Sequence, residues 1–128
     1  MKQLAFLFAI IVLVSCHKDN SPPTISFKTG AGYTSADAVV SPGQSIVVGI
    51  HAIAGADDLS LLYTEVAYDG TNDPHLVSRI WMSSNEHKSC DKDITITARA
   101  QAGTERWIFN INDNNGRISN VELRLTVQ

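Results

Sequence analysis

Apolar residues recur at every second position over most of the chain after residue 24, and this alternation constrains the fold more than any other feature. Neighbouring side chains of a β-strand point to opposite faces of the sheet, so a period of two gives one apolar and one polar face. Residues 45–54, 93–100 and 121–127 show the pattern most clearly. No helical stripe of comparable length competes with it. The sequence therefore predicts an all-β domain.

Turn residues divide this region into about seven strands and a short segment. The stretch 59–68 is apolar on both faces, which is typical of a central strand. The stretch 71–91 is ambiguous, because its apolar residues fit one strand or two, and 83–88 has the composition of a loop. Asn115-Gly116 favours a tight hairpin before the last strand. The expected elements are 24–28, 39–40, 45–54, 59–68, 76–82, 93–100, 106–111 and 121–127.

Short strands at this spacing predict an antiparallel β-sandwich of the immunoglobulin type. A small closed barrel is the alternative. A domain of this size buries roughly two-thirds of its unfolded surface, so it can fold without a disulfide or a metal. The residues expected to face inward and form the core are Trp107, Phe109, Ile50, Ile96, Leu123 and Leu125.

The N-terminal stretch has the features of an export signal. Lys2 supplies a positive charge, and residues 4–14 form an uninterrupted apolar run. A run of about eleven residues matches the apolar region of a signal peptide and is too short to span a bilayer, which takes about 20 residues. Residues 1–15 are therefore predicted to be a signal peptide.

The run ends in Leu13-Val14-Ser15-Cys16, which resembles the bacterial lipobox. The resemblance implies cleavage before Cys16, a diacylglycerol on its thiol and acylation of the new N-terminus. Two or three acyl chains make a stable membrane anchor, whereas one is marginal. The alternative is an ordinary secretory signal that happens to be followed by a cysteine.

Residues 16–23 are interpreted as the lipidated cysteine and a flexible tether, because the segment is polar and ends in Pro22-Pro23. Lys18 and Asp19 resemble the Lys-acid surface-export signal of Bacteroidetes lipoproteins, although Asn20 stands where a second acid would be. A solvated linker without any signal is an equally good interpretation. The resulting expectation is a lipid-anchored protein of the outer membrane, with display on the cell surface as a possibility.

Several stretches resemble small immunoglobulin-like lipoproteins of the Bacteroidetes type. They are residues 97–109 with 112–116, and the segments 29–33 and 41–44. The resemblance implies an immunoglobulin-like domain over residues 24–128 and an address in the cell envelope. It consists of strand and turn residues, so it transfers no functional residue.

No pattern in the sequence predicts a catalytic, metal or cofactor site. The four histidines lack paired metal-ligand spacing, and Gly-x-Ser-x-Gly does not occur. Aspartates at 57, 58, 69 and 73 would suit calcium if their loops met, but acidic turn residues are common without an ion. Cys90 lies in a polar stretch, where a free thiol, an intermolecular bridge and a plain loop residue all remain open. The chain is not expected to be an enzyme.

The net charge of −3 argues against nucleic acid as a partner, because a basic face is needed to neutralise phosphates. Trp81, beside Arg79 and Met82, is the best candidate for an exposed ligand contact, and a second core tryptophan is the competing interpretation. The favoured function is a non-catalytic binding or adhesion module for a protein or glycan. The alternative is a structural accessory subunit that docks on a larger envelope assembly.

Overall fold

The computed structural model describes residues 18–128, which form strands and one short 3₁₀ helix. Within these residues no segment forms an α-helix, so the all-β prediction is confirmed. None of the described helical residues makes a segment long and apolar enough to cross a membrane. The elements are β1 (Thr24–Phe27), β2 (Ala38–Val40), β3 (Ser45–Ile53), β4 (Leu59–Tyr68), β5 (His75–Trp81), η1 (Ser84–Glu86), β6 (Ser89–Thr97), β7 (Gly103–Asp113) and β8 (Ile118–Val127).

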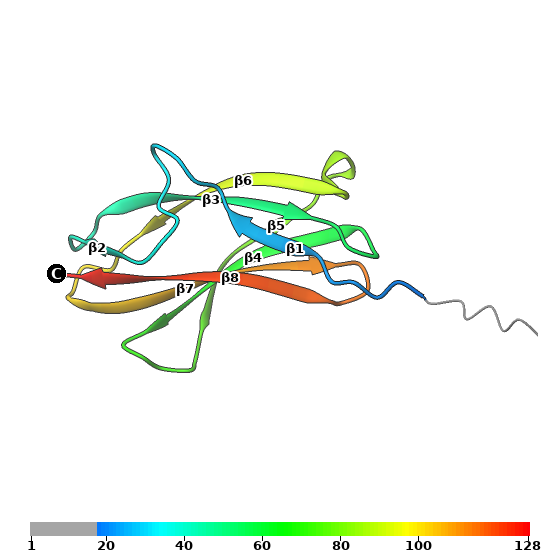
Figure 1. Cartoon of the computed structure of the whole chain (residues 1–128). Coiled ribbons are helices and arrows are strands. Elements are labelled where there is room, and N and C mark those ends of the chain that lie inside the picture. The colour runs from blue at the N-terminus through cyan, green and yellow to red at the C-terminus, as the bar shows by residue number, and fades with distance from the viewer. Residues whose placement is uncertain (1–17) are drawn as a thin grey trace, which may run out of the picture.

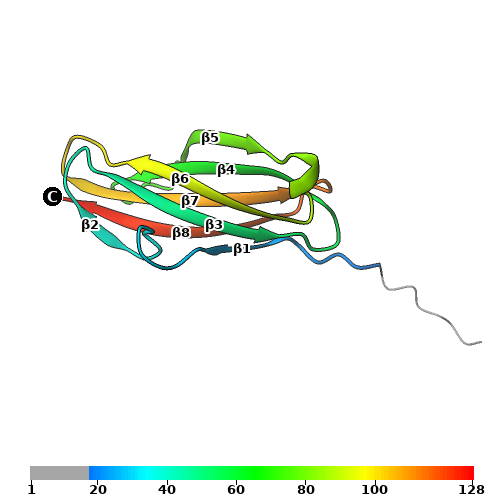
Figure 2. The ribbon, with the colours of Figure 1, turned by 90° about the horizontal axis from the view of Figure 1, so that it is seen from above.

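The strands form two sheets that pack face to face (Figures 1 and 2). One sheet has three strands in the order β1-β3-β6, and the other has five in the order β2-β8-β7-β4-β5. The alternation seen in the sequence explains the arrangement, because each sheet needs only one apolar face to bury against the other. The strands therefore make a two-layer sandwich and not a single closed barrel.

One pair of strands departs from the predicted antiparallel arrangement. β2 runs parallel to β8, whereas the other pairs among the described strands are antiparallel. The chain leaves β1 in one sheet, crosses over and continues in the same direction as β2 along the other sheet (Figure 1). A crossover of this kind depends on long-range packing, so the residues of β2 alone give no sign of it.

The core lies between the two sheets and contains all six residues predicted for it. Trp107, Phe109, Leu123 and Leu125 come from β7 and β8, and they face Ile50 and Ile96 across the sandwich. Phe27 of β1 meets Phe109 edge to face, with 5.9 Å between the ring centroids. The predicted register of β7 is therefore confirmed.

The ambiguous stretch 71–91 resolves into a single strand, a short helix and the start of β6. β5 pairs with β4, and no strand of residues 18–128 lies on its other side, so it is an edge of the five-stranded sheet. The expected loop at 83–88 contains η1. β6 begins at Ser89, four residues before the predicted start at Asp93, because Ala52 of β3 pairs with Cys90.

Candidate binding surface

The residues predicted for the anchor and the export signal lie at or before the start of the described chain. Cys16 lies outside the described residues. Lys18 and Asp19 are exposed. Asp19 accepts a hydrogen bond from the Ser21 backbone N–H at 2.9 Å, and this bond lowers the pKa of its carboxyl.

The next residues, Ser21 to Pro23, are held against the domain. The Ser21 carbonyl accepts a hydrogen bond from the Ala56 N–H at 3.0 Å, and the Pro23 carbonyl accepts one from the Ser119 hydroxyl at 2.6 Å. A Cβ at Gly55 would lie 2.3 Å from the carbonyl oxygens of both Ser21 and Pro22, so glycine is required for this close approach. The chain is thus fixed to the β3–β4 turn and the β7–β8 hairpin from Ser21 onward.

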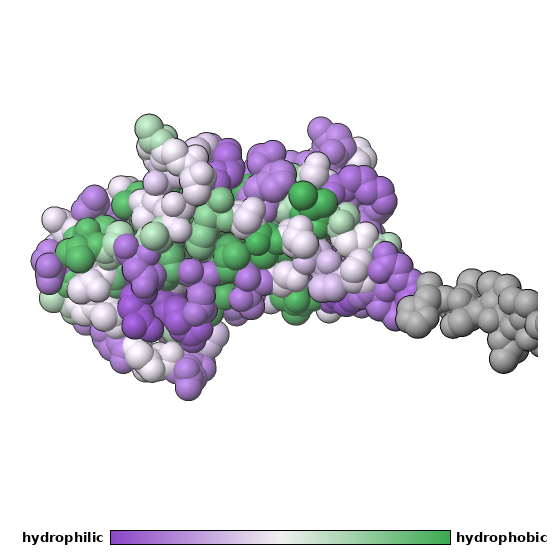
Figure 3. Space-filling model, in the orientation of Figure 1, coloured by the Kyte–Doolittle hydropathy of each residue, from purple (hydrophilic) through white to green (hydrophobic). Residues whose placement is uncertain are grey.

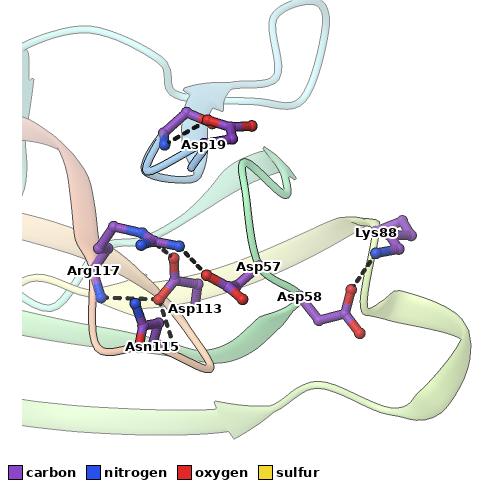
Figure 4. Close-up of polar contacts among 8 residues, drawn as sticks. Asp19, Asp57, Asp58, Lys88, Asp113, Asn115 and Arg117 are labelled. Carbon is purple, nitrogen blue, oxygen red and sulfur yellow. Dashed lines mark hydrogen bonds and ion pairs between the residues drawn. The ribbon is translucent and has the colours of Figure 1, made fainter. Parts of the chain in front are cut away.

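A cluster of charged residues stabilises the same end of the domain (Figure 4). Both Asn115 and Arg117 donate backbone hydrogen bonds of 2.9 Å to Asp113, and the Arg117 Nε donates another of 2.8 Å. Burial alone would raise the pKa of the Asp113 carboxyl, but these donors outweigh it and lower the pKa. Arg117 also pairs with Asp57, and Lys88 pairs with Asp58.

The four aspartates considered for calcium from the sequence do not come together in the structure. Asp57 and Asp58 precede β4, whereas Asp69 and Asp73 follow it, so the strand separates the two pairs by its whole length. Asp69 is held at the far end by Arg99, whose Nη1 donates a hydrogen bond of 2.8 Å to Oδ2. Each carboxylate that the sequence offered for an ion, apart from that of Asp73, already has a cationic partner.

The histidines of the described chain lie apart from one another. The Nδ1 atom of His51, on β3, lies within hydrogen-bond distance of Asp91 Oδ1, at 2.9 Å. His87 Nδ1 lies 3.8 Å from Asp58 Oδ2, and the ring of His75 packs against Tyr68. Among residues 18–128, no three His, Cys, Asp or Glu side chains gather in a way that could hold a metal ion.

Cys90 is part of the core, so it is not the loop residue that was one interpretation left open by the sequence. Its side chain is only 4% exposed and packs in the apolar cluster between the sheets. Burial raises the pKa of its thiol. A buried, protonated thiol is neither a nucleophile nor available for a bridge to another chain.

The outer face of the three-stranded sheet is polar, and its charged groups are paired with one another. Lys28 donates a hydrogen bond of 2.9 Å to Asp93, which also accepts one of 3.2 Å from the Tyr33 hydroxyl. Ser45 and Thr97 share a hydrogen bond of 2.8 Å. The hollow of about 420 Å³ beside Tyr33 is wide open and lined mainly by small or hydroxyl-bearing residues. These polar side chains therefore form hydrogen bonds and ion pairs with one another.

The outer face of the five-stranded sheet differs, because large side chains from β5 remain open to solvent. Trp81 is 68% exposed, and Leu76 and Val77 on the same edge strand are also exposed. The exposure of Trp81 excludes its interpretation as a second core tryptophan. On the side of the domain that Figure 3 presents, apolar residues form small patches among polar ones.

Strand pairing arranges this outer face in rows. Trp81 of β5 lies opposite Leu61 of β4, which lies opposite Asn112 of β7. The next row runs from Arg79 through Tyr63 to Asn110. We call these residues, together with Glu65 and Leu76, the Trp81 face: Leu61, Tyr63, Glu65, Leu76, Arg79, Trp81, Asn110 and Asn112.

A shallow hollow of about 210 Å³ lies in the Trp81 face, lined by Leu61, Tyr63, Glu65, Leu76, Arg79 and Asn112. The Glu65 carboxylate accepts a hydrogen bond of 3.0 Å from the Asn110 amide. The Oδ1 atom of Asn112 is buried and has no hydrogen-bond partner among the described residues. Burial, with the nearby Glu65 charge, raises the pKa of the Tyr63 hydroxyl, so Tyr63 is neutral and can donate a hydrogen bond.

The sequence identified Trp81 with its neighbour Arg79 but not the other residues of the Trp81 face. Leu61, Tyr63 and Glu65 alternate along 59–68, so a shared face was visible in the sequence. The sequence did not show which residues of other strands lie beside these three, because pairing across a sheet is a long-range property. Asn110 and Asn112 are on the polar side of β7, and nothing local links them to β5.

No protein-family model and no curated protein sequence matches the chain. Solved structures do resemble it in fold. The sporulation control protein Spo0M from Bacillus subtilis aligns with a TM-score of 0.55 at 8% identity, over 84% of this chain and 50% of that one, so this chain spans about half of its length. Superoxide reductase (neelaredoxin) from Ignicoccus hospitalis aligns with a TM-score of 0.50 at 13% identity, over 84% and 81% of the two chains.

A Niemann-Pick type C2 protein from the Japanese carpenter ant aligns at 9% identity with a TM-score of 0.47, over 84% of this chain and 90% of that one. Similarity at these identities concerns the arrangement of strands alone, because unrelated functions share such folds.

Proposed function

We propose that this chain is a lipid-anchored lipoprotein of the cell envelope whose domain is a non-catalytic binding module for a protein or glycan. The proposal includes an immunoglobulin-like topology for residues 24–128. The observation that supports it best is the exposed Trp81 on a rigid sheet. Exposed aromatic side chains are the usual anchors of binding surfaces, because they bury a large area with few rotatable bonds.

The anchor part of the proposal rests on the lipobox-like Leu13-Val14-Ser15-Cys16. Because the chain is fixed to the domain from Ser21, only residues 16–20 would separate the lipid from the domain. Five residues span at most about 18 Å. Lipid on Cys16 would therefore hold the β3–β4 turn and the β7–β8 hairpin close to the bilayer and leave the opposite end of the sandwich outermost.

A second candidate function is favoured by a specific feature of β5. This edge strand offers unpaired backbone groups beside the exposed Leu76 and Val77. Such an edge can accept a strand from another protein. An accessory subunit that docks on a larger envelope assembly would use β5 in this way.

Metabolic labelling with a fatty acid tests the anchor. Wild type is expected to incorporate label and Cys16→Ala to incorporate none, because the thiol is the site of diacylglycerol attachment in the proposal. The matched control is Ser15→Ala, which keeps a small residue before the cysteine. A labelled Cys16→Ala protein would contradict the proposal.

Protease treatment of intact cells of a Bacteroidetes host tests whether the domain is displayed on the cell surface. If Lys18 and Asp19 direct export, the wild-type domain is digested and a variant with Lys18→Ala and Asp19→Ala is protected. Protection of both proteins would place the domain in the periplasm, and the partner would then be sought among envelope proteins.

A further inference from the structure

We infer that the Trp81 face binds a carbohydrate chain, with one sugar ring stacked on the Trp81 indole and a neighbouring ring in the hollow beside Tyr63. This inference rests on the proposed binding function and names its ligand class. It draws on three independent features of the face: the placement of two aromatic rings, the unpaired guanidinium beside them, and the size of the hollow.

The two rings lie at a spacing that suits adjacent sugars. Trp81 pairs with Leu61, and Tyr63 is the next residue on the same side of β4. Diagonal neighbours across an antiparallel pair are about 7–8 Å apart. The faces of a pyranose ring carry C–H groups that pack against aromatic rings, so two rings at this distance can support consecutive units of a chain.

The Arg79 guanidinium is the polar group of the face that is open to a ligand. Arg79 is exposed and forms no ion pair within residues 18–128. A guanidinium group presents paired donors at about the spacing of vicinal hydroxyls. A ligand rich in hydroxyls would accept these hydrogen bonds and one from the Tyr63 hydroxyl, whereas an apolar ligand would leave the guanidinium unsatisfied.

The hollow is too small and too open for an enclosed small molecule. Its volume of about 210 Å³ is below the range of about 300–1,000 Å³ typical of sites for drug-sized ligands. An open hollow on a sheet instead suits one unit of a chain that continues along the surface.

A membrane surface would also accept an exposed tryptophan, but the charges at this end of the domain disfavour it. Of the basic residues there, Lys88 is paired with Asp58, Lys92 with Glu86, and Arg117 with Asp113, so that Arg79 is the unpaired one. Surfaces that recognise anionic lipid typically carry a cluster of about four to eight basic residues. Carbohydrate therefore fits the Trp81 face better than lipid does.

The test uses the full-length chain in a detergent without a sugar headgroup. A glycan array of neutral and acidic oligosaccharides identifies ligands, and tryptophan emission then measures their affinity. Trp107 is buried, so a blue shift on ligand addition reports on Trp81. Trp81→Ala is expected to weaken binding about tenfold or more, and Trp81→Phe, which keeps an aromatic ring, less. Ile53→Ala is the matched control, because Ile53 is an exposed apolar residue on the other sheet.

The inference is overturned if no glycan on the array binds wild type, or if Trp81→Ala binds as tightly as wild type. A blue shift with phosphatidylglycerol vesicles and none with glycans would also overturn it. If a protein partner is lost on Trp81→Ala while no glycan binds, the carbohydrate inference fails and the proposed binding module survives. If Trp81→Ala alters no interaction with either class, both fail.

Discussion

The two tryptophans of this domain belong to the same sheet and have opposite surroundings. Trp107 lies on the inner side of β7, is 4% exposed, and donates its indole N–H to Glu105 at 2.8 Å. Trp81 lies on the outer side of the edge strand β5 and is 68% exposed. One ring is enclosed with its polar atom satisfied, and the other is presented to solvent. The difference separates residues that stabilise the fold from residues available to a partner.

The largest effect is expected from truncating the enclosed ring. Trp107→Ala removes a side chain that fills the space between the sheets, and the resulting cavity should lower the free energy of unfolding by about 3–5 kcal/mol. Urea denaturation monitored by circular dichroism measures the change. Trp107→Phe keeps much of the volume and should lose less. A Trp107→Ala domain that unfolds like wild type would mean that the two tryptophans do not differ as described.

The hydrogen bond of the enclosed ring is tested by Glu105→Gln. Both carboxylate oxygens of the buried Glu105 are used, one by Trp107 Nε1 and the other by the Arg99 backbone N–H. A glutamine must turn its NH₂ toward one of these donors, which should cost about 1–3 kcal/mol of stability. Thermal unfolding of this variant beside Glu122→Gln, an exposed control, measures the effect. Equal stability of the two variants would contradict the prediction.

A smaller, pH-dependent effect is expected for Asp113, the enclosed carboxylate at the other end of the domain. Its pKa in the folded protein is lowered, so its ionised form stabilises the fold above the unfolded value of about 3.9. This stabilisation is lost as the pH falls through the folded-state pKa. Asp113→Asn should therefore be less stable than wild type by about 1 kcal/mol at pH 7, with the difference shrinking below about pH 4. Unfolding curves at pH 7 and pH 3 measure this, and an equal difference at both would refute it.

The smallest change in stability is expected for the exposed ring. Trp81 is 68% exposed and pairs with Leu61 across one strand pair, so Trp81→Ala should change the free energy of unfolding by less than about 1 kcal/mol. The same denaturation experiment as for Trp107→Ala makes the comparison direct. A loss as large as that for Trp107→Ala would show that Trp81 is a structural residue and not a free surface.

Most strands could be predicted because their information is local. The alternation along 45–54 and 106–111 identified β3, β7 and the inward set that includes Trp107 and Phe109. The stretch 59–68, apolar on both faces, coincides with β4, which lies between two neighbours. Asn115-Gly116 correctly indicated the hairpin, where Gly116 has a φ of 80°.

The start of β6 and the place of Cys90 could not be predicted in the same way. The stretch around Cys90 is polar, so local composition predicted a loop at 83–88 and no strand before Asp93. The pairing of Ala52 with Cys90 extends the strand into this stretch and buries the thiol. Pairing with a neighbouring strand therefore outweighed the local preference for a loop.

The sequence by itself determined that the domain is made of strands, which side chains face inward, and the lipobox-like motif on which the proposed anchor depends. Only the tertiary structure decided the order of the strands, the parallel pairing of β2 with β8, the burial of Cys90 and the position of β5 at an edge. A period of two assigns each side chain to a face of its own strand, but it does not say which strand lies alongside or which side is covered. The exposure of Trp81 depends on that second kind of information, because its side chain points to the outer face of the sheet, which no other described element covers.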